Sequence, residues 1–171
     1  MKIKTIRINS LSLIIIIILF FMAFNANAAE ENVSSPDACS QLPSSVIIDK
    51  SGNRIFINKP FKRMISLYAA HTENLFSLGP DKEITGVSKN EAYPPQVMTK
   101  AMFSYHDDAE KFIGANPDLI LIRPMIMRWY GNLVSKLQKA GITVVLLQPT
   151  LIKKFFAYWR ELGKLTGKKI G

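Results

Sequence analysis

The segment Asp118-Leu-Ile-Leu-Ile-Arg123 sets the fold class, because it reads as a β-strand that is apolar on both faces. Successive side chains of a strand point to opposite sides, so such a strand needs cover on both faces of its sheet. A second apolar strand is expected over residues 142–148, after a helix over Tyr130 to Ala140 that Gly141 ends. Strand, helix and strand in this order predict a parallel pair joined by a crossover helix.

The same alternation continues toward the N-terminus. Residues 63–68 and 84–88 read as buried strands. Between them, Thr72 is expected to cap a helix over residues 73–78, and Gly79 supplies its C-terminal stop. Each additional strand and helix in this order extends the parallel sheet by one unit.

Further helices are expected before and after residues 118–123 in the sequence. Pro94 and Pro95 open a turn or a short helix that runs to about Lys100, and Asp107 or Asp108 caps a helix over Ala109 to Ala115. A last, amphipathic helix is expected over residues 152–165. The residues expected on its apolar stripe are Phe155, Phe156, Trp159 and Leu162.

A β-hairpin is expected before the first of these strands. Val46–Asp49 and Ile55–Asn58 are short β-branched segments, and residues 50–54, Lys-Ser-Gly-Asn-Arg, between them have strong turn chemistry. Together the elements predict an α/β fold: a doubly wound, mostly parallel sheet with helices on both faces, preceded by a hairpin.

Charge and composition exclude several classes of protein. The chain has 171 residues and a net charge of +9, but the basic residues are scattered after the first seven positions, so nucleic-acid binding is not expected. Cys39 is the single cysteine, which rules out an internal disulfide. With one cysteine and only His71 and His106, a structural zinc site is not expected either.

The N-terminus has the pattern of a secretory signal peptide. Lys2, Lys4 and Arg7 precede an apolar run from Leu13 to Phe24, which at 1.5 Å per residue is about 18 Å long and too short to cross a bilayer. Ala26-Asn-Ala28 then supplies small residues for cleavage, although an uncleaved anchor is the alternative. We therefore expect export to the periplasm or the extracellular face of the cytoplasmic membrane.

The expected domain boundaries follow from this pattern. Residues 1–28 are the signal peptide, 29–43 a polar leader with two prolines, and 44–167 the folded lobe. Residues 168–171 follow that lobe.

Candidate binding residues gather where the expected strands end. Ligands of open parallel sheets lie beyond the carboxyl ends of the strands, so we expect ligand contacts in the loops that follow the strands. Tyrosines offer apolar rings with polar tips, methionine adapts to irregular shapes, and arginine holds a carboxylate or phosphate. The alternative for each position is an ordinary loop residue. The candidates are Tyr68, His71, Tyr93, Tyr105, Arg123 and Met125.

Four motifs in order resemble the cobalamin and iron-siderophore class of periplasmic binding proteins, which serve ABC importers. They are Arg63-Met-Ile-Ser-Leu-Tyr-Ala-Ala-His-Thr-Glu-Asn-Leu-Phe-Ser-Leu-Gly79, Gly86-Val-Ser88 through Tyr93-Pro-Pro95, Asn116-Pro-Asp-Leu-Ile-Leu121 and Leu162-Gly-Lys-Leu-Thr-Gly167. The resemblance implies two Rossmann-like lobes bridged by one rigid helix, with a metal chelate or corrinoid in the cleft between them. It also implies that Glu73 docks on arginines of the permease subunits; by its sequence position alone, Glu73 is an acid that favours a helix N-terminus.

The resemblance covers one lobe, because the chain ends where the bridging helix of the family begins. We expect a fragment or a truncated product that represents the N-terminal lobe, with residues 168–171 starting the interlobe helix. The expected function is capture of an iron chelate, such as a siderophore or haem, or of cobalamin by a monomeric, non-enzymatic protein without a resident cofactor or metal. The alternatives are a chelatase-like metal-dependent enzyme, for which His106-Asp107-Asp108 is the nearest motif, and a non-binding remnant.

Overall fold

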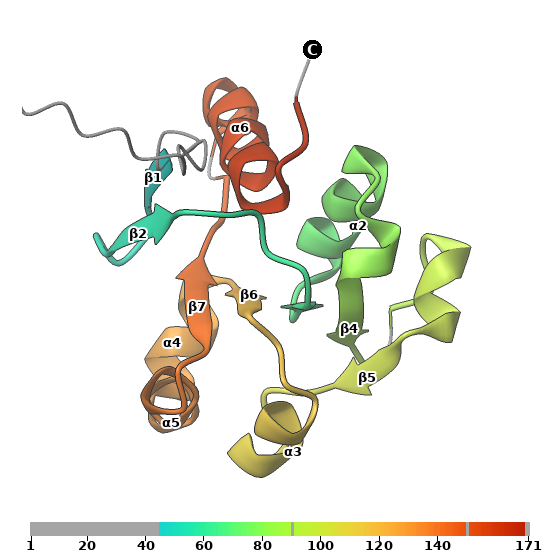
Figure 1. The fold of residues 1–171 in the computed structure, drawn as a ribbon, viewed down its shortest axis with the longest axis vertical. Helices are drawn as coiled ribbons and strands as arrows, with labels where there is room; N and C mark the ends of the chain where they lie inside the picture. The colour runs from blue at the N-terminus through green and yellow to red at the C-terminus, as the bar shows by residue number, and fades with distance from the viewer. Residues whose placement is uncertain (1–44, 90, 150, 170–171) are drawn as a thin grey trace, which may run out of the picture. The chain divides into compact units, whose positions relative to one another are not determined.

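A five-stranded parallel sheet organises the fold (Figure 1). The computed structural model describes residues 45–89, 91–149 and 151–169. The expected signal peptide and leader lie outside these residues. The strands are β3 (Met64–Ser66), β4 (Ile84–Ser88), β5 (Ala101–Phe103), β6 (Leu119–Ile122) and β7 (Thr143–Leu146), and their order in the sheet is β5-β4-β3-β6-β7. All neighbouring strands are parallel, which confirms the expected doubly wound α/β fold.

Helices cover both faces of the sheet. In Figure 1, α2 and α6 lie on one side of the strands, and α3, α4 and α5 lie on the other. The α-helices are α2 (Ala69–Leu78), α3 (Ala109–Gly114), α4 (Pro124–Trp129), α5 (Gly131–Lys139) and α6 (Phe155–Thr166), and three short 3₁₀ turns are η1 (Asp81–Glu83), η2 (Pro95–Thr99) and η3 (Ile152–Lys154).

Strand β6, which lies between β3 and β7, contributes to two separate cores, as its all-apolar sequence predicts. Leu121 belongs to one buried cluster with Leu75 of α2 and Leu162 of α6. Ile120, the preceding residue, belongs to a second cluster with Phe112 of α3. Because alternate residues of β6 enter opposite clusters, a polar substitution anywhere in this strand would be buried.

The expected hairpin is confirmed and joins the first cluster. Strands β1 (Ser45–Ile48) and β2 (Arg54–Ile57) pair antiparallel as a separate two-stranded sheet. Ile47 and Ile57 are buried in the same cluster as Leu162 of α6. The hairpin therefore extends the core on the α2 and α6 side.

The Asn-Pro-Asp segment before β6 fixes the start of β3. Asn116 adopts a left-handed conformation with φ of 48°, which asparagine tolerates better than most residues. The Asp118 carboxylate then accepts hydrogen bonds from the backbone N–H groups of Lys62 at 2.7 Å and Arg63 at 2.9 Å. The Arg63 side chain returns a bond to the carbonyl of Ala115 at 2.8 Å. This exchange holds two segments more than 50 residues apart in the sequence.

The start of α2 differs from the expectation. The helix begins at Ala69, so Thr72 lies inside it and does not cap it. The Thr72 hydroxyl is buried and donates to the Ser66 hydroxyl at 2.9 Å, because the loop from β3 turns directly into the helix. Glu73 consequently lies beyond the first turn. Gly79 ends the helix as expected, with φ of 88°.

Two elements were absent from the expectation, β5 and α4. β5 has only three residues, of which Ala101 and Met102 are exposed, so it lacks the apolar signature of the other strands. Helix α4 occupies residues 124–129, which were interpreted as a loop. Pro124 stands in its first turn, where the fixed φ of proline favours a helix start.

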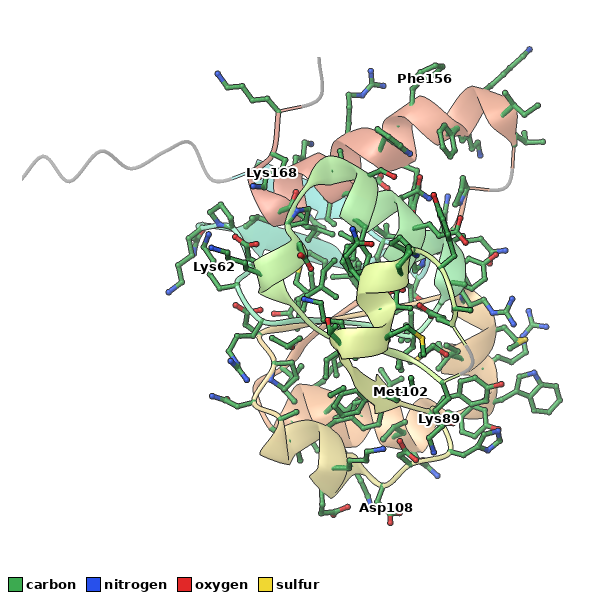
Figure 2. All side chains as sticks on the ribbon, turned by 90° about the vertical axis from the view of Figure 1, so that its right-hand side faces the viewer. Lys62, Lys89, Met102, Asp108, Phe156 and Lys168 are labelled. Carbon is green, nitrogen blue, oxygen red and sulfur yellow. The ribbon has the colours of Figure 1, made fainter. Side chains whose placement is uncertain are left out.

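The apolar stripe of α6 was partly wrong. Phe156 is 71% exposed and projects away from the sheet (Figure 2), and Phe155 is also exposed. Leu162 is buried as expected, and Trp159 packs partly buried against the same cluster. The other buried apolar side chains of the stripe are Tyr158 and Leu165, four residues before and three residues after Leu162. The expected stripe was chosen by the size and apolarity of the side chains alone. The face of α6 that is buried is the one in the same cluster as Ile47 and Ile57 of the hairpin.

Asp108 precedes α3 as one of the two expected caps, but its side chain makes no capping hydrogen bond. It points to the outside of the molecule in Figure 2. Asp107 accepts from the backbone N–H of Ser104 at 2.9 Å, so it closes the turn before the helix.

Candidate functional site

The sheet has a topological switch point between β3 and β6, where two expected site residues meet. The chain leaves β3 toward β4 and leaves β6 toward β7, in opposite directions across the sheet. Tyr68 follows β3 and Arg123 follows β6. The guanidinium carbon of Arg123 lies 5.0 Å from the centre of the Tyr68 ring, which is the geometry of a cation–π contact. Ligands of open α/β sheets bind at such a point.

Met125 and His71 complete this group, which we call the switch-point cluster: Tyr68, His71, Arg123 and Met125. The Arg123 side chain donates to the sulfur of Met125 at 3.5 Å. The His71 ring meets the Tyr68 ring edge-on, with 5.0 Å between the centres. Tyr68, Arg123 and Met125 are each partly exposed, whereas His71 is fully buried. The first three can therefore contact a ligand directly, and His71 lies behind them.

His71 joins the cluster to helix α6. Its Nδ1 atom lies 2.7 Å from the Tyr158 hydroxyl oxygen, within hydrogen-bond distance. Burial lowers the pKa of His71 to about 4, and the positive charge of Arg123 acts in the same direction. The imidazole is therefore neutral at pH 7. Its Nε2 atom is buried without a hydrogen-bond partner in the described part of the chain.

Glu91 is a second buried titratable group near this edge, and sequence reasoning missed it. It follows the end of β4, and neither carboxyl oxygen has a hydrogen-bond partner among the residues described. Burial raises the pKa of Glu91, and the negative charge of Glu73 adds to the effect. Its one sequence signal was its position two residues before Tyr93-Pro-Pro95.

Tyr105 lies in a different group, the edge aromatic cluster, formed by Tyr105, His106 and Tyr130. The Tyr105 ring centre is 4.6 Å from that of His106 and 4.8 Å from that of Tyr130. The Tyr130 hydroxyl lies 3.1 Å from Nδ1 of His106. Trp129, next in sequence, is 72% exposed. Sequence reasoning did not place Trp129 or Tyr130 at this edge: Trp129 ends α4, which was expected to be a loop over residues 123–128, and Tyr130 was considered only as the start of the next helix.

Asp107 is held by two lysines, which leaves little support for a metal site at His106-Asp107-Asp108. Its carboxylate pairs with Lys111 at 2.6 Å and with Lys89 at 3.2 Å. The hydrogen bond from Lys111 is the largest of several effects that lower the pKa of Asp107 to about 2. Within residues 45–89, 91–149 and 151–169, no group of three or more His, Cys, Asp or Glu side chains is placed to hold a metal ion.

Tyr93 and Glu73 stand apart from both clusters. Tyr93 is 66% exposed, and no ring contact or hydrogen bond of its side chain is found with the other described residues. Glu73 is exposed on α2. The structure thus brings four of the six expected binding residues together and leaves Tyr93 and Tyr105 elsewhere.

Comparisons with known proteins confirm the resemblance to binding proteins of ABC importers. An uncharacterized ABC transporter substrate-binding lipoprotein of Bacillus subtilis is 29% identical over 120 residues, which cover 70% of this chain and 38% of that protein. A cobalamin-binding protein of Halobacterium salinarum is 27% identical over 124 residues, 70% of this chain and 33% of that protein. The chain thus spans less than two fifths of the length of these relatives. No protein-family model matches.

A solved structure agrees with the fold. A possible iron-binding, periplasmic solute-binding protein from Staphylococcus epidermidis superposes with a TM-score of 0.59 at 31% identity. The match covers 64% of this chain and 43% of that one. The names of these similar proteins describe substrate-binding, cobalamin-binding and periplasmic solute-binding proteins. Across the described residues, no helix combines the length and the apolar character needed to cross a membrane.

Proposed function

We propose that this chain is one lobe of the solute-binding component of an ABC importer, which captures an iron chelate, haem or cobalamin outside the cytoplasmic membrane. The observation that carries the proposal is the contact of Tyr68 and Arg123 at the switch point, where the guanidinium carbon lies 5.0 Å from the centre of the tyrosine ring. An aromatic face beside a guanidinium suits a flat or aryl ligand that also bears acidic groups. Haem, catecholate-type chelates and corrinoids all combine a large apolar surface with polar substituents.

His71 has a positioning role in this site, because it supports the Tyr68 ring and does not face the ligand. The buried ring packs edge-on against Tyr68 and engages Tyr158 of α6, so it sets where the Tyr68 ring stands. A neutral imidazole beside Arg123 avoids a second positive charge, which leaves the guanidinium free to pair with an acidic ligand group. His71 is therefore proposed as a positioning residue, and Tyr68, Arg123 and Met125 as the contacts. Tyr93 and Tyr105 are proposed as more distant contacts for a ligand that extends along the sheet edge.

The coverage of the relatives supports a second lobe. The matched relatives are more than twice as long as the aligned region, so we propose that another α/β lobe closes the cleft over this edge. Glu73, exposed on α2, is proposed to dock on arginines of the permease. A charge pair of this kind steers encounter and fixes register.

The test uses the protein that carries both lobes. Replacing Tyr68 or Arg123 by alanine should weaken solute binding by about 1–3 kcal/mol each, through lost ring burial or lost charge-assisted hydrogen bonds. Calorimetric titration of the solute into each variant measures the change. The control is Phe56→Ala, which removes an exposed aromatic ring from the hairpin, away from the switch-point cluster. Unchanged affinity in both Tyr68→Ala and Arg123→Ala would refute this placement.

A further inference from the structure

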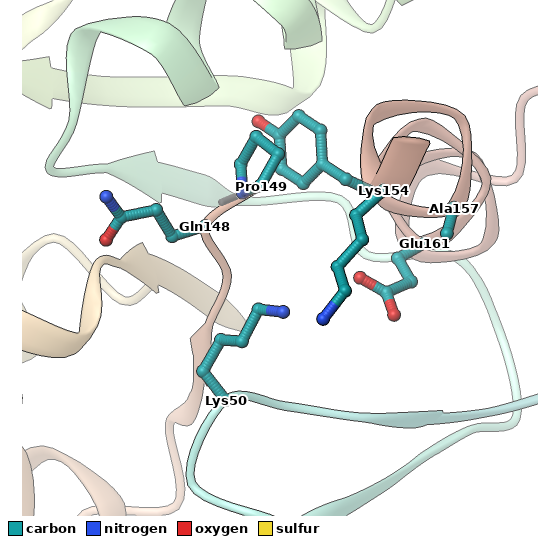
Figure 3. Close-up of a pocket in the computed structure, with 7 residues that line it drawn as sticks. Lys50, Gln148, Pro149, Lys154, Ala157 and Glu161 are labelled. Atoms are coloured by element: carbon teal, nitrogen blue, oxygen red, sulfur yellow. The ribbon is translucent and has the colours of Figure 1, made fainter. Parts of the chain in front are cut away.

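A cavity lies between the hairpin, the loop after β7 and helix α6 (Figure 3). Its volume is about 280 Å³, close to the lower limit of small-molecule pockets at about 300 Å³. Most of the residues that line it carry polar or charged groups, beside apolar surface that includes Pro149 and Ala157. Those used below are Lys50, Gln148, Lys154, Tyr158 and Glu161.

Lys50 is held in place by the hairpin turn. The buried Asp49 carboxylate accepts hydrogen bonds from the backbone N–H groups of Ser51 at 2.8 Å and Asn53 at 2.9 Å. The backbone N–H of Lys50 itself donates to the carbonyl of Leu146 at 2.9 Å. These bonds tie the turn to the end of β7, so the root of the Lys50 side chain is fixed at the rim of the cavity.

Helix α6 presents the opposite wall. Tyr158 and Glu161 lie three residues apart in α6 and share one face of it, and Lys154 directly precedes the helix at the end of η3. Figure 3 shows the ammonium ends of Lys50 and Lys154 directed into the same space. The positive end of the α6 dipole lies on this side as well, which favours an anion.

The charges of the cavity are not paired with one another. Among the described residues, neither Lys50 nor Lys154 belongs to any of the ion pairs of the structure. Glu161 is the one acidic group of the lining; burial raises its pKa, while the nearby charge of Lys50 opposes that change. Two ammonium groups facing one half-buried carboxylate leave an excess of positive charge.

We propose that this cavity binds a small organic anion with at least two carboxylates, one for each of Lys50 and Lys154. Gln148 offers an amide donor to a further oxygen of the ligand. The cavity is separate from the switch-point cluster, although Tyr158 contributes to both: it lines the cavity, and its hydroxyl engages His71. The inference therefore does not depend on which solute the main site takes.

Calorimetric titration of citrate into the purified protein tests the proposal. We expect saturable, one-to-one binding that weakens at least tenfold in Lys50→Gln and in Lys154→Gln. Glu161→Gln should instead tighten binding, because it removes the carboxylate that repels the anion. Thermal melts of each variant verify that the fold is kept.

The control removes two lysine charges, as many as Lys50 and Lys154 carry together, from another face of the molecule. Lys136→Gln with Lys139→Gln, both exposed on α5, should leave citrate binding unchanged. Absence of citrate binding, or equal weakening in this control pair, would overturn the proposal. Inorganic phosphate that bound as tightly as citrate at the same lysines would overturn the assignment to an organic polyanion.

Discussion

His71 is the residue whose environment differs most from what its place in the sequence indicates. It follows a strand-end loop, where exposed ligand contacts are common, yet the ring is fully buried between Tyr68 and Tyr158. The reason is the early start of α2, which turns the His71 side chain inward one residue before the buried Thr72. A histidine buried in the neutral form makes stability depend on pH.

We predict that the protein loses stability between pH 6.5 and about 4 because of His71. In the unfolded chain histidine binds a proton near pH 6.5, whereas in the folded protein it does so only near 4. Between these values the unfolded state binds more protons, so the free energy of unfolding falls as pH falls, by up to about 1.4 kcal/mol per pH unit. Above pH 6.5 the contribution is fully present. Urea unfolding at several pH values measures it.

The control for this prediction is His106, the other histidine, which is exposed. His71→Gln should flatten the pH dependence in this range, whatever its effect on stability at pH 7. His106→Gln should preserve the slope. A slope that survives in His71→Gln would show that another group is responsible.

The expectation that site residues gather beyond the carboxyl ends of the strands correctly brought Tyr68 and Arg123 together. Tyr68 and Arg123 were expected from loops 55 residues apart and meet because β3 and β6 are neighbours, which follows from the doubly wound topology. Glu91 and Tyr130 could not be predicted in the same way. The burial of Glu91 and the contact between Tyr130 and His106 depend on tertiary packing, which the local sequence pattern does not specify.

At the scale of elements, β4 and β5 fit together through Gly86. A methyl group at Gly86 would lie 2.7 Å from Cδ2 of Phe103 and 3.2 Å from the side chain of Ile65, closer than carbon atoms pack. The glycine thus leaves room for the ring of the edge strand. This contact explains a glycine inside a strand, where it otherwise costs stability.

Gly86→Ala should therefore destabilise the protein by about 1–3 kcal/mol through overpacking. Phe103→Leu in the same chain should recover part of this loss, because it removes the ring that the methyl group meets. The control is Gly131→Ala at the start of α5, where nothing lies within 4 Å and alanine suits the helix better. Denaturant unfolding of the unchanged protein, Gly86→Ala, Phe103→Leu, the double variant and the control measures these effects. Additive effects of Gly86→Ala and Phe103→Leu would contradict this explanation.

Most elements were predictable because their sequences carry strong signals. β6 and β7 are continuous apolar strands, and α5 has helical spacing ended by Gly141. β5 could not be found, since an edge strand with two exposed residues has no such pattern. The start of α2 was misplaced because Thr72 has the chemistry of a cap, and only the hydrogen bond to Ser66 shows that its hydroxyl is used inside the fold.

At the scale of the whole molecule, replacing Glu73 distinguishes docking on the permease from binding of the solute. It is exposed and lies beyond the first turn of α2, so its removal should change stability by no more than about 0.5 kcal/mol. Glu73→Ala in the two-lobed protein should leave melting temperature and solute affinity nearly unchanged and impair uptake, most visibly at low salt. Transport assays with permease-containing vesicles measure this effect.

Glu110→Ala is the matched control, because Glu110 is an exposed acid on α3, away from α2. It should transport normally. Normal transport by Glu73→Ala, or a loss of solute affinity in that variant, would refute the docking role.

Titration of haem, a ferric siderophore and cobalamin into the two-lobed protein tests the proposed solute site most directly, with binding followed by calorimetry and by the absorbance of each solute. The account predicts that one of the three binds one-to-one with a Kd in the micromolar range or tighter, and that Tyr68→Ala weakens this binding while Phe56→Ala does not. Failure of all three solutes to bind, or equal affinity in the Tyr68→Ala variant, would contradict it.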